Sequence, residues 1–336
     1  MTELEELKNK LISIVGNYKE WLGLQFDQDH ISRWLNQFPQ AIHHTLLEEL
    51  CFVLEKSYLN KEDIENYFKT AIIEPNLITP ERTNTLKKIS LLEIQDGGNS
   101  QKDCNKIFND ILEKRINHRS LINSPDSQIY LYLDDVVFSG QRVRTDLIKW
   151  VRNTAPSECQ IYVFSHTMHQ LSCWYNQKKI EEEILKSGKN VTLKILCERL
   201  VEDRLAFTDR SDVLRPVDRQ RSLSVENYVK TLQKPPAYRN AGSVGGQKFF
   251  SNDQNRQLLE DAFLEAGSKI REICPNFSQF HRPLGYMSLD SLGFGTMIVS
   301  YRNCPNNAPL ALWAGHPWYP LFPRSNNISV AQRLGF

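Results

Sequence analysis

The most constraining feature of this chain is residues 129–143, which run from an apolar stretch through two carboxylates to a turn and a helix start. The first five residues are aliphatic or aromatic at every position, as expected of a strand buried on both faces of a parallel sheet. Asp134 and Asp135 follow, and after three more residues Ser139 and Gly140 open a segment that predicts a helix. Ligands of parallel sheets bind at the carboxyl ends of the strands, where these carboxylates fall. The glycine lets the backbone approach a ligand, and the helix start offers free N–H groups to a phosphate.

Two other interpretations of the adjacent carboxylates stay open at this point. The simplest is a strand that ends in two solvated acids before an ordinary turn. A phosphohydrolase of the haloacid type requires Asp-x-Asp after its strand, and the direct adjacency of Asp134 and Asp135 argues against that class. The Ser-Gly pair and the helix behind it favour a phosphate site.

With its acids and its Ser-Gly pair in this order, the segment resembles the phosphoribosyl-pyrophosphate (PRPP) loop of type I phosphoribosyltransferases. In that family the acids bind the ribose 2- and 3-hydroxyls, and the loop holds the 5-phosphate. The resemblance implies that Asp134 and Asp135 are the catalytic ribose carboxylates. The phosphate-binding residues would be Ser139, Gly140, Gln141 and Arg142. The last of these replaces the Thr or Ser of the family, so a guanidinium stands where the hydroxyl is usual.

A second strand–loop–helix unit precedes the first. A short apolar strand, 89–94, leads into a polar turn and a helix that bears Cys104 and Phe108. The turn contains Gly97, Gly98, Asn99 and Ser100. Such a turn can form a nest of backbone N–H groups that holds an anion, although most turns of this composition are ordinary. In type I phosphoribosyltransferases the pyrophosphate loop stands in this order before the PRPP loop, so the resemblance implies the same role here.

The connection between the two units, residues 115–128, is shorter than in that family. Type I phosphoribosyltransferases normally insert another strand and a flexible catalytic hairpin there. The short connection favours a module that binds without transfer, whereas the intact Asp-Asp pair favours an enzyme.

Composition excludes several classes of protein. Lys plus Arg number 41 and Asp plus Glu 40, so no global charge attracts the chain to nucleic acid or to a membrane surface. The seven cysteines are scattered without any Cys-x-x-Cys, which argues against a zinc ribbon or a disulfide framework and predicts a reduced, cytoplasmic setting. No stretch approaches about 18 consecutive apolar residues, and the N-terminus lacks an apolar signal core, so we expect no membrane insertion.

The periodicity of the first 75 residues predicts helices, with Asp27 or Asp29 as a candidate N-cap. A small winged-helix unit is an alternative, but no clustered basic recognition helix is visible. We therefore predict a helical N-terminal cap over 1–75 and an α/β domain with a C-terminal hood over 76–336.

The α/β rhythm continues beyond the PRPP-like segment. Strands are predicted at 160–165 and 190–197, with a helix at 181–187 between them. His166 and His169 follow the first of these strands. A polar loop explains the two histidines more simply than a role as ligands.

Three short phrases near the C-terminus narrow the resemblance. They are Pro-Leu-Gly-Tyr at 283–286, Asn-Cys-Pro-Asn-Asn at 303–307 and Leu-Phe-Pro-Arg at 321–324. Together with the two loops they resemble the phosphoribosyltransferase-like domains of bacterial conflict (anti-phage) systems, some of which are encoded beside retron reverse transcriptases. The resemblance covers roughly residues 20–325.

The same region holds candidates for base recognition. Asn306 and Asn307 lie next to an apolar strand and present side-chain amides of the kind that recognise a base edge. The alternative is that Pro-Asn-Asn is a turn, and that Trp318, Tyr319 and Phe322 are buried anchors.

We therefore expect an α/β fold like that of type I phosphoribosyltransferases, with a mostly parallel sheet flanked by helices. The resemblance implies an anti-phage effector or toxin that binds PRPP or a nucleotide with Mg²⁺ and transfers or cleaves at ribose C1. The alternative is a catalytically inactive, nucleotide-sensing docking module of a retron-type reverse transcriptase–RNA complex. Expected partners are PRPP or a nucleotide, a reverse transcriptase with its RNA or DNA, or another protein of a defence operon. No residue is assigned as a metal ligand, and the base or acceptor is not identified.

Overall fold

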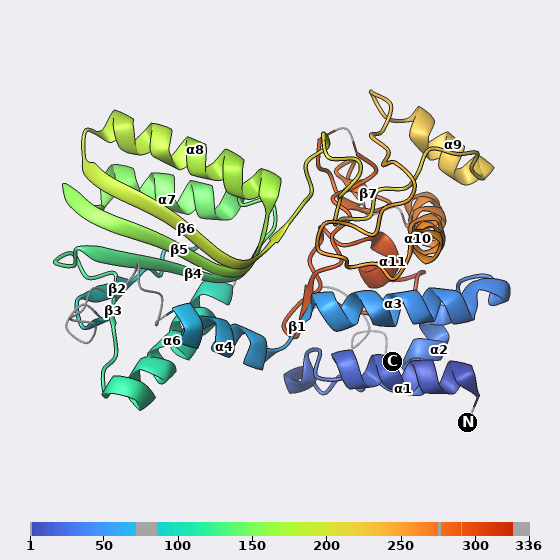
Figure 1. The fold of residues 1–336 in the computed structure, drawn as a ribbon, viewed down its shortest axis with the longest axis horizontal. Helices are drawn as coiled ribbons and strands as arrows, with labels where there is room; N and C mark the ends of the chain where they lie inside the picture. Colours follow the sequence, from blue (N-terminus) through green and yellow to red (C-terminus); the bar gives the residue numbers. More distant parts are fainter. Residues whose placement is uncertain (1, 72–85, 98, 275–276, 290, 325–336) are drawn as a thin grey trace. The chain divides into compact units, whose positions relative to one another are not determined.

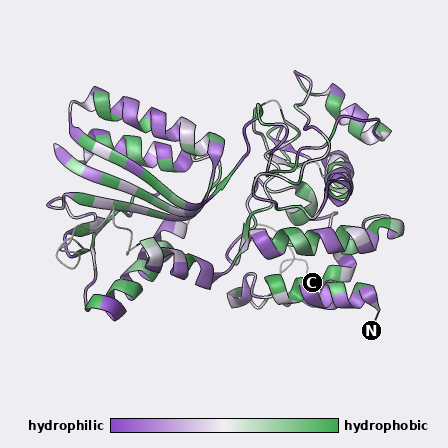
Figure 2. Cartoon of the chain, in the orientation of Figure 1, coloured by the Kyte–Doolittle hydropathy of each residue, from purple (hydrophilic) through white to green (hydrophobic). Residues whose placement is uncertain are grey.

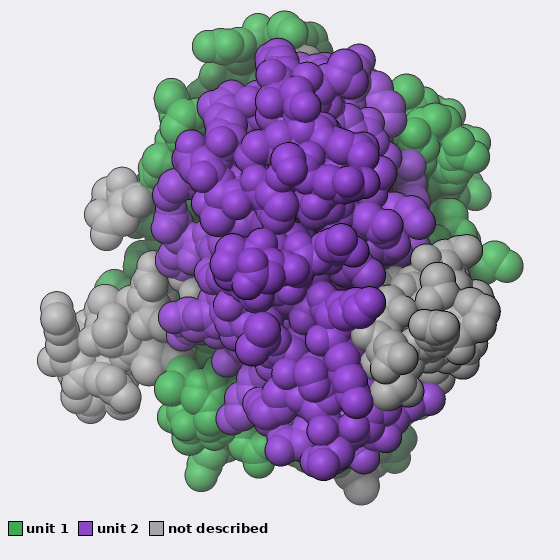
Figure 3. Space-filling model, turned by 90° about the vertical axis from the view of Figure 1, so that its left-hand side faces the viewer, with its two compact units in different colours: residues 1–60, 202–336 green, residues 61–201 purple. Residues whose placement is uncertain are grey.

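The computed structural model describes residues 2–71, 86–97, 99–274, 277–289 and 291–324. The chain divides into two compact units, one formed by residues 1–60 with 202–336 and the other by 61–201 (Figure 3). The domain boundary predicted after residue 75 falls outside the described residues.

Unit 61–201 is built on a five-stranded sheet in which every neighbouring pair is parallel. The strands, in their order across the sheet, are β3 (Leu121–Ile122), β2 (Ile89–Leu91), β4 (Ile129–Val137), β5 (Glu158–His169) and β6 (Asn190–Val201). This confirms the predicted α/β class with a mostly parallel sheet. The first strand, β2, lies between β3 and β4, so the direction of winding reverses there. Such a switch point is where open parallel sheets bind their ligands.

Helices cover both faces of this sheet. α7 (Gln141–Asn153) and α8 (Gln170–Ser187) lie on one face, and α4 (Lys61–Ala71) and α6 (Ser100–Ile116) lie on the other (Figure 1). Hydrophobic and hydrophilic residues alternate along α7 and α8, as expected of helices with one packed face (Figure 2). The core under them is mostly aliphatic and includes an aromatic pair, with the Tyr130 and Trp150 ring centroids 4.8 Å apart.

The other unit joins the two ends of the chain. Its helices are α1 (Glu3–Val15), α2 (Gln28–Leu35), α3 (His43–Ser57), α9 (Leu223–Lys230), α10 (Asp253–Ile273) and α11 (Leu310–Trp313). Two short strand pairs accompany them, β1 (Tyr58–Leu59) with β9 (Val299–Ser300) and β7 (His281–Arg282) with β8 (Gly285–Tyr286). Asp27 is the N-cap of α2.

Residues 1–60 of the predicted N-terminal cap pack with the C-terminal hood within this unit, whereas α4 packs on the sheet of the other unit. The indole N–H of Trp34 donates to the carbonyl of Ala311 at 2.8 Å. The Tyr18 ring lies edge-on to Phe322 with centroids 5.0 Å apart. Trp318 and Phe322 are buried, as the anchor interpretation expects, whereas Tyr319 is only partly buried.

The predicted polar loop around the two histidines is wrong. β5 extends to His169, so both histidines lie within the strand and are buried. His166 packs against the Tyr67 ring of α4, and His169 packs against Phe138. Their polar nitrogens find partners in the protein, which allows burial: His166 Nδ1 lies 2.9 Å from Thr167 Oγ1.

Among the described residues, no helix combines the length and the apolar character needed to cross a membrane.

Candidate functional site

The two predicted ribose carboxylates lie near the carboxyl end of β4, beside β5. Asp134 is 7 % exposed, and Asp135 is partly buried. The Asp134 carboxylate accepts a hydrogen bond from the backbone N–H of Asp135 at 3.0 Å, and the Asp135 carboxylate accepts one from Val136 N–H at 2.9 Å. Successive side chains of a strand point to opposite faces, so the pair spans both sides of the sheet edge.

Burial raises the pKa of the Asp134 carboxyl well above its usual range, the neighbouring Asp135 raises it further, and the Ser100 hydroxyl opposes the shift. Desolvation penalises the charged form of an acid. A ligand that donates hydrogen bonds to this carboxylate offsets that penalty. Such an arrangement is more typical of a functional site than of a structural strand end.

The predicted pyrophosphate loop lies between β2 and α6, and Ser100 links it to the ribose carboxylates. The Ser100 hydroxyl donates to Gln95 Oε1 at 3.2 Å. It also lies near the Asp134 carboxyl, whose pKa it lowers against the effect of burial. The structure thus brings the two predicted loops together at the switch point between β2 and β4.

The rest of this loop has three further predicted residues. Gly97 has a φ of +80°, and a Cβ at this position would meet nothing within 4 Å, so backbone conformation rather than space requires the glycine. Asn99 is the N-cap of α6 but makes no side-chain capping bond. Gly98 lies outside the described residues.

The turn between β4 and α7 is braced by α8, which sequence reasoning did not anticipate. The Asn176 side-chain amide donates to the carbonyls of Ser139 and Ser172, at 2.9 and 2.7 Å. Arg144 Nη1 in turn donates to Asn176 Oδ1 at 3.1 Å. No local sequence signal marks these bracing residues, because they meet the turn only through the packing of α7 against α8.

Gly140 is required by both conformation and space. Its φ is +63°, and a Cβ there would lie 2.2 Å from Asn176 Nδ2 and 2.4 Å from Ser172 Oγ. The glycine was predicted for its approach to a phosphate, but its closest neighbours are these two side chains of α8.

We expect Gly140→Ala to lower the free energy of unfolding by roughly 2–3 kcal/mol, from backbone strain plus displacement of the Asn176 brace. Gly188→Ala is the matched control, because Gly188 has a φ of +69° with nothing within 4 Å of a built Cβ. The control is expected to lose only about 1 kcal/mol. Urea titrations of both variants measure the difference. Equal losses of unfolding free energy would show that the Asn176 side chain can move aside without an energetic cost.

Gln141 and Arg142 occupy the first turn of α7 with exposed side chains. The positive charge of Arg142 acts on Asp146 one turn further on, where it opposes the increase that burial causes in the pKa of that carboxyl. The phosphate contact of these two residues stays a prediction.

The base-recognition candidates belong to the other compact unit. The Asn306 carbonyl accepts a hydrogen bond from Tyr286 N–H at 2.8 Å. Asn307 is 8 % exposed, and its carbonyl lies so close to Gly285 that a Cβ there would be 2.1 Å away. These backbone contacts hold the Pro-Asn-Asn segment in place, and a role of the two amides toward a base stays a prediction.

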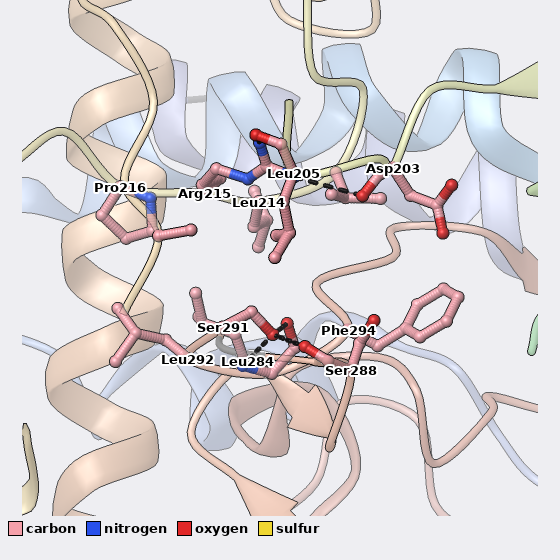
Figure 4. Close-up of a pocket in the computed structure, with 13 residues that line it drawn as sticks. Asp203, Leu205, Leu214, Arg215, Pro216, Leu284, Ser288, Ser291, Leu292 and Phe294 are labelled. Carbon is pink, nitrogen blue, oxygen red and sulfur yellow. Dashed lines mark hydrogen bonds between the residues drawn. The ribbon is translucent and has the colours of Figure 1, made fainter. Parts of the chain in front are cut away.

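A small cavity in the same unit is a less suitable site (Figure 4). Its most polar wall is Arg215, whose guanidinium donates to the carbonyls of Asp203 and Leu205 at 3.1 and 3.2 Å. Ser291 Oγ donates to Gly293 O at 2.7 Å. With these groups bound to the backbone, the cavity offers little for specific recognition.

A model of the family PRTase-CE matches residues 31–324, which include all of unit 61–201. No curated protein and no solved structure matches the chain.

Proposed function

The chain belongs to the PRTase-CE family and is phosphoribosyltransferase-like, and from this we propose that it binds a ribose-phosphate compound, PRPP or a nucleotide, and transfers or cleaves at ribose C1. One observation carries the proposal: the Asp134–Asp135 pair and the Ser100 loop meet at the switch point of a parallel sheet. A strand end with two solvated acids would not require the burial of Asp134 or its contact with a second loop.

The chemistry follows from the charges. Departure of a leaving group from ribose C1 develops positive charge on the ring. Asp134 and Asp135 would accept hydrogen bonds from the ribose diol and stabilise that charge, since preorganised groups aimed at developing charge lower the barrier. The amino end of α7 would hold the 5-phosphate, because its first N–H groups and its dipole favour an anion. No side chain needs to act as a nucleophile.

Mg²⁺ is the cofactor that fits this site. The described residues contain no cluster of three or more His, Cys, Asp or Glu side chains that could form a dedicated metal cage. Mg²⁺ usually binds through substrate phosphates with one or two carboxylates and several waters, a set that Asp134 or Asp135 with a bound diphosphate would complete. When bound, the ion neutralises negative charge on the leaving pyrophosphate.

The three C-terminal sequence phrases resemble those of proteins from bacterial conflict systems, and this resemblance supports a role in anti-phage defence. We place the protein as a cytosolic effector of anti-phage defence, with a reverse transcriptase and its nucleic acid, or another protein of the same operon, as partner.

A second candidate function rests on a specific feature of the sheet. Between α6 and β4 the chain forms only the two-residue strand β3, whose side chains are exposed, and no catalytic hairpin. This favours a catalytically inactive module that senses a nucleotide and docks to a reverse transcriptase–RNA complex.

Purified protein incubated with PRPP or nucleotides and Mg²⁺ tests both functions. Release of pyrophosphate or free base is the expected result for the enzyme. Saturable binding by calorimetry without turnover would support the sensing module, and absence of both binding and turnover would overturn the ribose-phosphate proposal.

Arg142→Glu is expected to lower PRPP affinity by roughly tenfold or more, because it places like charge beside the 5-phosphate. Arg142→Thr restores the hydroxyl usual in this type of loop and is expected to keep most of the affinity. Arg115→Glu, which makes the same charge change at the exposed last turn of α6, serves as the control. Calorimetric titration with PRPP measures these affinities. Equal affinity of wild type and Arg142→Glu would show that Arg142 does not contribute to phosphate binding.

A further inference from the structure

The outer side of β6 is an open strand edge of more than ordinary length. β6 is the last strand of the five-stranded sheet and pairs with β5 along its 12 residues, and no described strand pairs with its other side. The Asn190 N–H donates to Ser157 O, toward β5, so the backbone groups of every second residue from Val191 onward point away from the sheet. Such a row of N–H and C=O groups is a template for another strand.

Proteins usually protect such edges, and the two edges of this sheet differ in that respect. β3, at the opposite edge, has only 2 residues, and a very short strand offers little to a partner. β6 contains neither Pro nor Gly and keeps one register with β5 throughout, so no bulge turns the edge away. Its Leu193, Ile195 and Leu196 side chains are only partly buried. The β6 edge is therefore long, regular and partly apolar.

The helix that borders this edge carries exposed apolar side chains as well. α8 packs on β6 and runs alongside it (Figure 1). Its Trp174, Tyr175 and Leu185 side chains are 56, 41 and 81 % exposed. A strand that pairs with β6 brings its own unit next to α8, where apolar side chains gain from burial.

Lys194 and Glu198 determine which partner fits the edge. Both are exposed, and they lie four residues apart on the same face of β6. When a second β6 runs antiparallel about a two-fold axis at Leu196, Lys194 lies opposite Glu198 of the second copy, and the pair repeats across the axis. An axis at Lys194 or at Glu198 would place like charges opposite each other, which is destabilising. The edge is thus complementary to itself in this register.

Neighbouring groups leave both side chains accessible. Lys194 Nζ lies 5.4 Å from the centroid of the Tyr162 ring of β5. Glu198 Oε2 lies 3.5 Å from His166 Nε2, and the Glu198 side chain is 59 % exposed. The positive charge of Arg199 also acts near Glu198. Burial lowers the pKa of His166, which favours the neutral imidazole. The carboxylate is therefore free to reach a cation across the edge.

We propose that the protein forms a two-fold symmetric dimer in which β6 pairs antiparallel with β6 of a second copy, with the axis at Leu196. The two sheets then join into one continuous sheet. A two-fold interface requires a self-complementary surface, which the charge pattern of β6 supplies. Main-chain hydrogen bonds between the two edges provide affinity, as in other cases of strand addition. The inference uses no residue of the ribose-phosphate site, so it stands or falls independently of the proposed function.

Ile195→Pro tests the pairing itself. The N–H of Ile195 points away from β5, so proline removes a donor from the dimer and leaves the hydrogen bonds between β5 and β6 in place. Sedimentation velocity of the full chain over a range of micromolar concentrations measures the mass. We expect wild type to sediment as a dimer. We expect Ile195→Pro to sediment as a monomer with an unchanged far-ultraviolet circular dichroism spectrum.

Charge exchange at the two paired positions tests the register. Lys194→Glu alone, or Glu198→Lys alone, places like charges opposite each other at both pairs. Each is expected to raise the dimer Kd roughly tenfold or more. The double variant Lys194→Glu/Glu198→Lys restores opposite charges and is expected to return the Kd close to that of wild type. These exposed substitutions also decide the question if Ile195→Pro does not fold.

Three results would contradict the proposal. Wild type that sediments as a monomer throughout the concentration range overturns it outright. A dimer that persists in folded Ile195→Pro overturns it too, because another surface then holds the two copies together. A dimer whose Kd does not change in either single charge variant overturns the axis at Leu196.

Discussion

Asp134→Ala combined with Asp135→Ala is expected to abolish measurable binding and turnover of PRPP or nucleotides. Each carboxylate that accepts a ribose hydroxyl contributes about 1.5–3 kcal/mol as a charged hydrogen-bond partner, so the pair accounts for at least a hundredfold in affinity. Calorimetry with PRPP and a pyrophosphate-release assay measure the loss. If the protein harms its host or a phage-infected cell, that effect is expected to disappear with it.

The same double variant is expected to fold. Burial raises the pKa of Asp134 in the folded protein above its unfolded value, so its favourable contribution to stability is present at low pH and is lost as pH rises through the raised pKa. Above that raised pKa the ionised carboxylate opposes folding, and its removal relieves that cost.

Glu181→Ala with Glu182→Ala is the control for the loss of two adjacent acids on the surface of the same unit. It is expected to leave binding unchanged. If the folded Asp134→Ala/Asp135→Ala protein keeps full activity in the cell, the enzymatic function is excluded and the function as a docking module is retained.

Glu260→Ala is expected to cost about 3–5 kcal/mol of folding free energy, because it leaves two buried arginines without their shared anion. Glu260 Oε1 lies 2.9 Å from Arg256 Nε, and Oε2 lies 2.9 Å from Arg239 Nε, with all three side chains fully buried. The carboxylate also accepts from the backbone N–H of Arg215 at 3.0 Å. Desolvation already lowers the pKa of Arg256, and Glu260 opposes this.

Urea denaturation of the full chain, followed by tryptophan fluorescence, measures the effect. Glu272→Ala on the same helix is the control. Its carboxylate is exposed and accepts a hydrogen bond from the Ser224 hydroxyl, so the expected change stays within about 0.5 kcal/mol. In Glu260→Ala, Arg239 would still pair with Asp253, which lies 2.7 Å away, and this pair partly compensates the charge of the guanidinium. A loss for Glu260→Ala no larger than that of the control would show that the guanidinium groups find other acceptors without cost.

The local pattern of the chain predicted the elements that carry the candidate site. The apolar run before Asp134 became β4, and the segment after Gly140 became α7. Strand and helix are determined largely by hydrophobic period and by turn residues, both of which are visible within some ten residues. The same pattern placed the acids directly after the strand, whereas β4 continues through them to Val137, because Val136 and Val137 also pair with β5.

Burial of polar residues was not predictable in this way. His166 and His169 were predicted to lie in a polar loop. Instead β5 continues through them, and the rings of Tyr67 and Phe138 pack against their imidazoles. Polar side chains can be buried when tertiary partners satisfy them, and those partners are distant in sequence.

By itself, the sequence determined the α/β class, the two strand–loop–helix units and the placement of Asp134 and Asp135, because these depend on local periodicity and chain order. Only the tertiary structure decided that Ser100 lies near Asp134 and that Asn176 braces the turn at Gly140. It also decided that residues 1–60 and the C-terminal hood form one unit, whereas α4 joins the sheet unit. These contacts join segments that are far apart in the sequence, so the local hydrophobic periodicity carries no information about them. They form because the close packing of helices on a sheet brings particular side chains together.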